Sequence, residues 1–83
     1  MTIAKLQQFL AVCQLQSVTR AAEFLHISQP SVSGTIRELE HEFQVNLFRH
    51  EGRRLVLTAE GSFLREHAQQ LIRQFDELSW QME

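Results

Sequence analysis

The 83-residue sequence has few of the features that mark secreted, membrane-spanning or low-complexity chains. Its one cysteine, Cys13, excludes an internal disulfide framework and fits a reducing compartment. No apolar run approaches the roughly 18 residues that a membrane-spanning helix requires, and no basic-then-apolar leader opens the chain. With one proline and three glycines, it also has no linker rich in these residues. We therefore expect one small, soluble, cytoplasmic protein without a membrane partner.

The sequence also lacks the motifs of catalysis and of metal binding. There is no glycine-rich phosphate loop and no nucleophile elbow. Glu38 and His41 have the spacing of a helical metal motif, but such sites require a second copy and further carboxylates. Cys13 lies on an apolar helical stripe, which favours a buried structural thiol over a nucleophile. These absences predict a protein that is not an enzyme and that holds neither a metal nor a cofactor.

The net charge of −2 argues at first against a nucleic-acid partner, but the charge is unevenly distributed. Residues 1–58 contain six basic and five acidic residues, whereas residues 59–83 contain two basic and five acidic residues. Three arginines lie within residues 49–54. The net charge therefore conceals a weak local basic patch, which does not imply tight non-specific binding.

Three helices are predicted in the first half of the chain. Apolar residues at helical spacing between residues 3 and 13 indicate the first, and Thr2 is placed to cap it. Ser17 and Ser28 are placed to cap a short second helix and a third helix. Pro30 falls in the first turn of the third helix, where its missing N–H has no intrahelical partner. Only two residues separate the second helix from the cap of the third, which predicts a tight helix–turn–helix.

The apolar period changes after these helices. Residues 47–50 and 54–57 predict two short strands. Gly52, within the connecting residues 51–53, supplies the positive φ that a tight hairpin needs.

A long final helix is predicted after Thr58, its N-cap, with Glu60 in the first turn. Its apolar residues recur at alternating steps of four and three: Leu64, Ala68, Leu71, Phe75, Leu78 and Met82. This pattern is a heptad seam of fewer than three heptads. Because no further element within the chain is available to cover the seam, we expect it to pair with a second copy in a homodimer.

The third predicted helix, residues 29–43, has two distinct faces. Apolar residues at steps of four, three and four are expected to face the core: Val32, Ile36, Leu39 and Phe43. The outward face then carries small or hydrogen-bonding residues and one cation: Gln29, Pro30, Ser31, Ser33, Gly34 and Arg37. A helix that enters the major groove needs such a slim face, polar groups for base edges and a positive dipole end near phosphate. The pattern predicts a recognition helix for double-stranded DNA.

Gly34 allows two interpretations within this helix. It is either a point at which DNA approaches the helix closely, or a tolerated exposed residue that costs about 1 kcal/mol of helix stability. A single glycine in a sequence does not decide between them.

The predicted hairpin carries cations that suit the same ligand. Arg53 sits at its tip, where we expect it to enter the minor groove beside the recognition helix. Arg49 and Arg54 lie nearby and are placed to meet phosphates. Glu51 at the same tip would repel phosphate and speaks against a strong electrostatic contribution.

These residues resemble the DNA-binding domain of LysR-type transcriptional regulators. The similarity covers nearly the whole chain, and its most specific segments are Ser28-Gln29-Pro30-Ser31-Val32-Ser33 and Leu57-Thr58-x-x-Gly61. It implies a mainly α fold, with a winged helix–turn–helix in residues 1–58 and a linker helix in residues 59–83 that pairs antiparallel in a dimer. It also implies a transcriptional regulator that binds an operator with an inverted repeat. A small-molecule effector is expected only in a C-terminal domain outside these residues.

The resemblance also implies which residues contact DNA, and this sequence differs from the family pattern at three positions. In that family, DNA is touched by the positions that match four residues of the recognition helix and one of the wing: Gln29, Pro30, Ser33, Gly34 and Arg53. The family usually has glycine where this chain has Gln44, and often a long polar side chain at Gly34. It usually has arginine where this chain has His50. His50 therefore either faces the DNA as a part-time cation or packs against the hairpin.

The alternative function is a dimerisation module that does not bind DNA. The net negative charge and Glu51 favour this alternative. The outward face of the third helix and the arginine-tipped hairpin speak against it, because a dimerisation module needs neither. Salt-dependent binding of a DNA duplex distinguishes the two functions.

Overall fold

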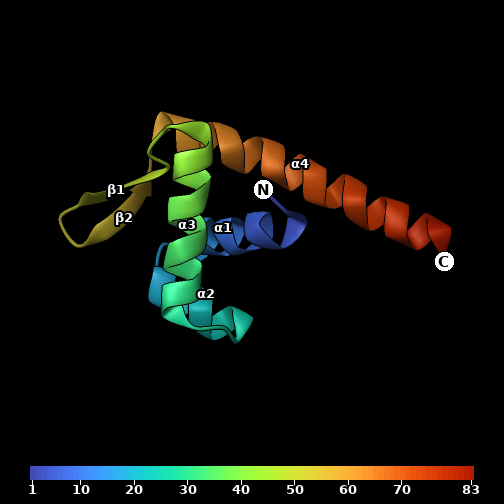
Figure 1. Cartoon of the computed structure of the whole chain (residues 1–83), viewed down its shortest axis with the longest axis horizontal. Helices are drawn as coiled ribbons and strands as arrows, with labels where there is room; N and C mark the ends of the chain where they lie inside the picture. Colours follow the sequence, from blue (N-terminus) through green and yellow to red (C-terminus); the bar gives the residue numbers. More distant parts are fainter.

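The computed structural model describes all residues from Met1 to Glu83 and contains four helices and one two-stranded sheet (Figure 1). In chain order these are α1 (Ile3–Leu15), α2 (Val18–Leu25), α3 (Gln29–Phe43), β1 (Phe48–Glu51), β2 (Arg54–Leu57) and α4 (Ala59–Met82). This order confirms the predicted mainly α fold, a winged helix–turn–helix followed by a long helix. In Figure 1, α4 starts beside the C-terminal end of α3, runs past α1 and extends beyond it, whereas the hairpin projects to the other side of α3.

Each helix begins directly after the hydroxyl residue that was expected to cap it. The side chains of four residues accept a hydrogen bond from the backbone N–H three positions further on: Thr2, Ser17, Ser28 and Thr58. Pro30 lies in the first turn of α3, as expected, where it removes no intrahelical hydrogen bond. Local side-chain chemistry therefore sets where every helix of this chain starts.

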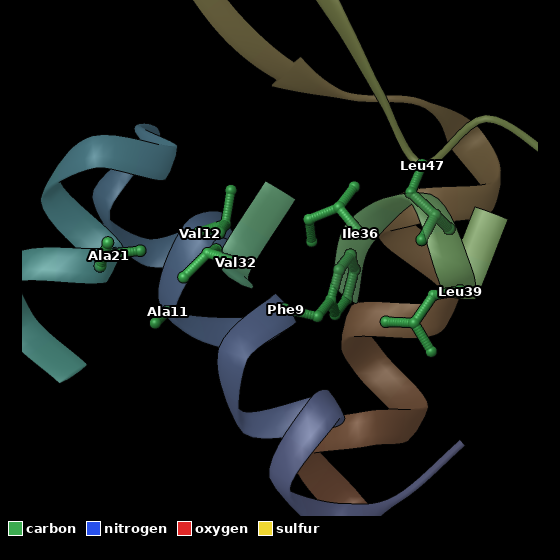
Figure 2. Packing of buried hydrophobic residues seen from close by; sticks show 9 residues of the cluster. Phe9, Ala11, Val12, Ala21, Val32, Ile36, Leu39 and Leu47 are labelled. Carbon is green, nitrogen blue, oxygen red and sulfur yellow. The ribbon is translucent and has the colours of Figure 1, made fainter. Parts of the chain in front are cut away.

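The core lies where α1, α2 and α3 meet the base of the hairpin, and Figure 2 shows the side chains that fill it. The largest fully buried side chains come from α1, α3 and the segment before β1: Leu6, Phe9, Val12, Val32, Leu39 and Leu47. Ala21 and Ala22 of α2 are also buried, and their small size lets α2 pack closely on its neighbours. The ring of Phe9 packs against that of Phe48 with centroids 5.5 Å apart, which ties the hairpin to the helices.

Two expectations about packing are wrong. Phe43 was placed on the core face of α3 but is 39% exposed at the end of that helix. The heptad seam of α4 was expected to be uncovered, yet Ala68 is fully buried and Leu64 packs against the core. The reason is that α4 packs across α1, so its first half belongs to the domain. The uncovered part of the seam starts at Leu71, which is 44% exposed.

The β1–β2 hairpin, which we call the wing, has antiparallel register Phe48↔Leu57, Arg49↔Val56, His50↔Leu55 and Glu51↔Arg54. Its loop consists of two residues, Gly52 and Arg53, and Gly52 has a φ of 62°. A positive φ at the first loop position is typical of the tight turns that connect twisted strands. The first strand begins and ends one residue later than predicted, and Leu47, which directly precedes it, is buried in the core.

Thr58 and Gly61 hold the joint between the wing and α4. The Thr58 hydroxyl donates to the carbonyl of Asn46 and accepts from the N–H of Gly61, while the Thr58 N–H donates to the carbonyl of Leu47 at 3.0 Å. The N–H of Leu47 in turn donates to the Glu40 carboxylate at 2.8 Å. A Cβ built on Gly61 would lie 2.1 Å from the Leu47 carbonyl oxygen. The Leu-Thr-x-x-Gly segment therefore fixes the start of α4 against the segment that precedes the wing.

The first three helices all end on a residue in the left-handed conformation, and none of these residues is glycine: Gln16, His26 and Gln44. Gln44 has a φ of 55°, and its N–H caps the carbonyls of Glu40 and His41. Its side-chain Nε2 also donates to the His41 carbonyl at 2.7 Å. The glutamine thus closes α3 in a conformation that favours glycine.

We expect Gln44→Gly to stabilise the domain by about 1 kcal/mol, because glycine adopts the left-handed conformation without a Cβ clash. The lost side-chain hydrogen bond offsets part of this gain. Urea denaturation measures the change, with Gln14→Gly as the matched control. Gln14 is an exposed residue inside α1, so glycine there should lower stability by about 1 kcal/mol. A lower midpoint for Gln44→Gly would mean that the amide contact outweighs the backbone strain.

Candidate nucleic-acid interface

The outward face of α3 has the composition that the sequence predicted. Gln29, Pro30, Ser31 and Arg37 are exposed and Ser33 and Gly34 are half-buried, while Val32, Ile36 and Leu39 are buried on the opposite face. The polar side chains at its N-terminal end are hydrogen-bonded to one another. Gln29 Nε2 donates to Ser33 Oγ at 3.2 Å, and Ser28 Oγ donates to Ser31 Oγ at 2.8 Å. This end of α3 therefore presents pre-oriented amide and hydroxyl groups to solvent.

His41 extends this face and was missed as an interface residue. Pro30, Gly34, Arg37 and His41 follow one another at steps of four, three and four, which places them on one side of the helix. His41 is exposed and lies in the last turn of α3. The helical spacing of the sequence alone places His41 on this face.

All three acidic residues of α3 are engaged within the chain. Glu38 forms an ion pair with Lys5, and Glu42 forms one with the N-terminal amino group at 3.0 Å. The hydrogen bond and charge of Lys5 hold the pKa of Glu38 below its usual range, so that this carboxylate stays ionised. Glu40 accepts the N–H of Leu47. Arg37 is then the side chain that brings positive charge to the outward face.

The wing presents its cations in different environments. Arg49 is paired with Glu51 at 2.9 Å on one face of β1, so Glu51 compensates a charge of the wing. Arg53 occupies the loop and Arg54 follows it, and both are exposed. His50 is paired with Leu55 and shares a face with Phe48, which packs on the core, yet His50 itself is exposed. The wing therefore offers Arg53 and Arg54 as its uncompensated cations.

The structure brings no catalytic or metal-binding group together. Burial raises the pKa of the Cys13 thiol to about 12, and the nearby charge of Arg65 opposes this only in part. The thiol is therefore protonated at neutral pH and is a poor nucleophile. No three histidine, cysteine, aspartate or glutamate side chains gather where they could hold a metal ion. None of the helices has an apolar stretch long enough to cross a membrane.

Comparison with protein families identifies the class of this domain. Residues 3–62 match the family described as bacterial regulatory helix-turn-helix protein, lysR family. The chain belongs to this family, which confirms the resemblance seen in the sequence. It is a DNA-binding helix–turn–helix domain of transcription regulators, and the prediction that it is not an enzyme is confirmed as well.

Individual relatives agree with this assignment. The uncharacterized HTH-type transcriptional regulator YxjO of Bacillus subtilis (strain 168) is 43% identical over 72 residues, which cover 87% of this chain and 25% of YxjO. The HTH-type transcriptional regulator PcaQ of Agrobacterium fabrum is 48% identical over 63 residues, which cover 76% of this chain and 20% of PcaQ. The chain thus spans a quarter or less of either relative.

A solved structure has nearly the same fold. The crystal structure of the BenM DNA-binding domain in complex with catB site 1 DNA superposes with a TM-score of 0.94 at 34% sequence identity. The match covers 99% of this chain and 91% of that one, so it includes α4 as well as the winged helix–turn–helix.

Proposed function

We propose that this chain binds operator DNA sequence-specifically, with residues 1–58 as the DNA-binding unit and residues 59–83 as the linker helix of a dimer. The recognition helix α3 lies in the major groove and Arg53 of the wing lies in the minor groove. The observation that carries the proposal is the outward face of α3, which is slim and polar, while the acidic side chains of the helix all have partners within the chain. The relatives are longer than this chain, and the whole regulator acts in the cytoplasm with a small-molecule effector bound in a further C-terminal domain.

The contacts divide into base readout and phosphate binding. Gln29 and Ser33 are suited to base edges, and Pro30 and Gly34 let the helix approach them. Phosphate contacts fall to the hydroxyl and cationic groups around them: Ser31, Arg37, Arg49, His50 and Arg54. The likeness to the BenM DNA-binding domain, which was crystallised with DNA, supports DNA as the ligand of this surface.

The second half of α4 supports a homodimer. Four large apolar side chains of the heptad seam remain exposed: Leu71, Phe75, Leu78 and Met82. Leu64 and Ala68, the first residues of the seam, are covered by the chain itself and serve mainly to seat α4 on α1. We therefore place the centre of the dimer contact in residues 71–82. A two-fold symmetric dimer reads an operator that is itself an inverted repeat.

We expect Arg53→Ala to weaken DNA binding at least about tenfold and to lower the slope of log affinity against log salt by about two. The reason is that each of the two wings of the dimer loses one cation that contacts the DNA. Fluorescence anisotropy over a range of salt concentrations measures both quantities. Arg73→Ala is the matched control, since Arg73 is an exposed arginine of α4 far along the chain from α3 and the wing.

If the salt slope of Arg53→Ala is the same as that of the unmodified chain, Arg53 does not contact the DNA and the proposed wing contact is wrong. If the unmodified chain showed no salt-dependent binding to any duplex, the dimerisation module without DNA binding would become the better account of the sequence. The two results are separable, because the first concerns one residue and the second the whole surface.

A further inference from the structure

Gly34 has no role in the packing of the domain. A Cβ built at this position would meet nothing within 4 Å, and the residue lies in the middle of an otherwise regular helix. A glycine at such a position makes the helix less stable by about 1 kcal/mol than alanine would. The other helical glycine, Gly61, differs, because the carbonyl of Leu47 leaves no room for a side chain there. The folded chain therefore gives no packing reason for glycine at position 34.

The surroundings of Gly34 define what could occupy the space beside it. Pro30 is one helical turn before Gly34 on the same face, and its ring is exposed. Together they form a small apolar surface, the Pro30–Gly34 shelf. Gln29 and Ser33, which are hydrogen-bonded to each other, lie on one side of it, and Arg37 follows one turn later. The shelf offers no hydrogen-bonding side chain of its own.

We propose that Gly34 is a specificity-determining position at which the missing side chain makes room for the 5-methyl group of a thymine. The inference rests on the proposed binding of α3 in the major groove. There, the thymine methyl is the apolar group that a base edge presents, whereas the other positions are hydrogen-bond donors and acceptors. The Pro30–Gly34 shelf is apolar and has no hydrogen-bonding side chain, so it suits the thymine methyl group and not the polar edge of a base. Each half-site then carries an A·T pair opposite Gly34.

The alternative reason for glycine is steric only. A bare helix face could bring the backbone closer to DNA without contact to a methyl group. The two accounts predict different effects of removing the thymine methyl group. Deoxyuridine allows this comparison, because it pairs as thymidine does and lacks only the methyl group. The test therefore replaces single thymines by deoxyuridine.

The experiment starts from the duplex that the 83-residue chain itself selects from a library with a random central segment. Each thymine of that duplex is then replaced singly by deoxyuridine, and binding is measured at fixed salt. We expect one thymine per half-site to show a loss of about fourfold on removal of its methyl, the size expected for burying one such group. Gly34→Ala should bind the thymine and deoxyuridine duplexes equally, because its own methyl occupies the space.

Two controls accompany this experiment, one for folding and one for the position of the substitution. Gly34→Ala should unfold at a higher urea concentration than the unmodified chain, since alanine favours the helix and meets no neighbour. Glu42→Ala, on another side of α3 and paired with the N-terminal amino group, should keep the preference for the methyl group.

The inference fails if no thymine of the selected duplex shows a methyl effect, or if Gly34→Ala keeps the effect in full. The second result would assign the methyl contact to another residue, such as Pro30. If the chain selects no duplex at all, the proposed DNA binding fails as well, so that the two failures are distinguishable.

Discussion

Replacing Gly61 with alanine is expected to destabilise the folded domain by about 3 kcal/mol. The added methyl group would lie 2.1 Å from the Leu47 carbonyl oxygen and 2.8 Å from a methyl carbon of Leu57. The carbonyl belongs to the backbone and already accepts the N–H of Thr58, so it cannot move away without breaking the joint. For a domain of this size, the loss corresponds to a fall of about 15 °C in the melting temperature.

Gly34→Ala is the matched control for this prediction. It makes the same chemical change in another helix, where the added methyl group meets no atom. The two variants should shift the unfolding midpoint in opposite directions in urea or thermal denaturation. A Gly61→Ala protein as stable as the unmodified chain would show that α4 can move away from Leu47 at little cost.

Introducing a carboxylate into the exposed part of the α4 seam is expected to abolish the dimer. Leu71 and Phe75 are 44% and 46% exposed in the single chain, so Leu71→Asp or Phe75→Asp should leave the fold of one copy intact. In the proposed dimer the new carboxylate is buried without a partner, and two-fold symmetry buries two of them. Each unpaired buried charge costs about 3 kcal/mol, so the two together cost about 6 kcal/mol and we expect the dissociation constant to rise about ten-thousandfold.

Sedimentation equilibrium measures this loss, and circular dichroism shows whether each variant is folded. Gln69→Asp is the matched control, because Gln69 is an exposed residue of α4 on the side that borders α1. Leu64→Asp should behave differently again and unfold the domain, since Leu64 packs against the core. If Leu71→Asp and Phe75→Asp both remained dimeric, the exposed seam would not be the interface.

The amino-acid sequence by itself determined the elements of this protein and their order. The hydroxyl groups of Thr2, Ser17, Ser28 and Thr58 predicted the start of each helix, because a capping interaction involves residues only three positions apart. The two faces of α3 followed from helical spacing in the same way. The wing was predicted from Gly52 and the change of apolar period, with an error of one residue in β1.

The tertiary structure alone decided which surfaces of these elements are covered. A heptad pattern shows that a helix has an apolar side but not what packs against it. The core of this chain covers Leu64 and Ala68 and leaves the rest of the seam exposed. Likewise, Glu38 and Glu42 pair with Lys5 and the amino group of Met1, more than 30 residues away in the chain.

The same distinction separates the glycines of the two helices. Both lie within predicted helices, and helical spacing does not show what either one faces. In the folded chain Gly61 lies against the backbone of Leu47, whereas Gly34 faces open space. A residue's spacing encodes the face of the element on which it lies, but its neighbours come from distant segments that are brought together only when the chain folds.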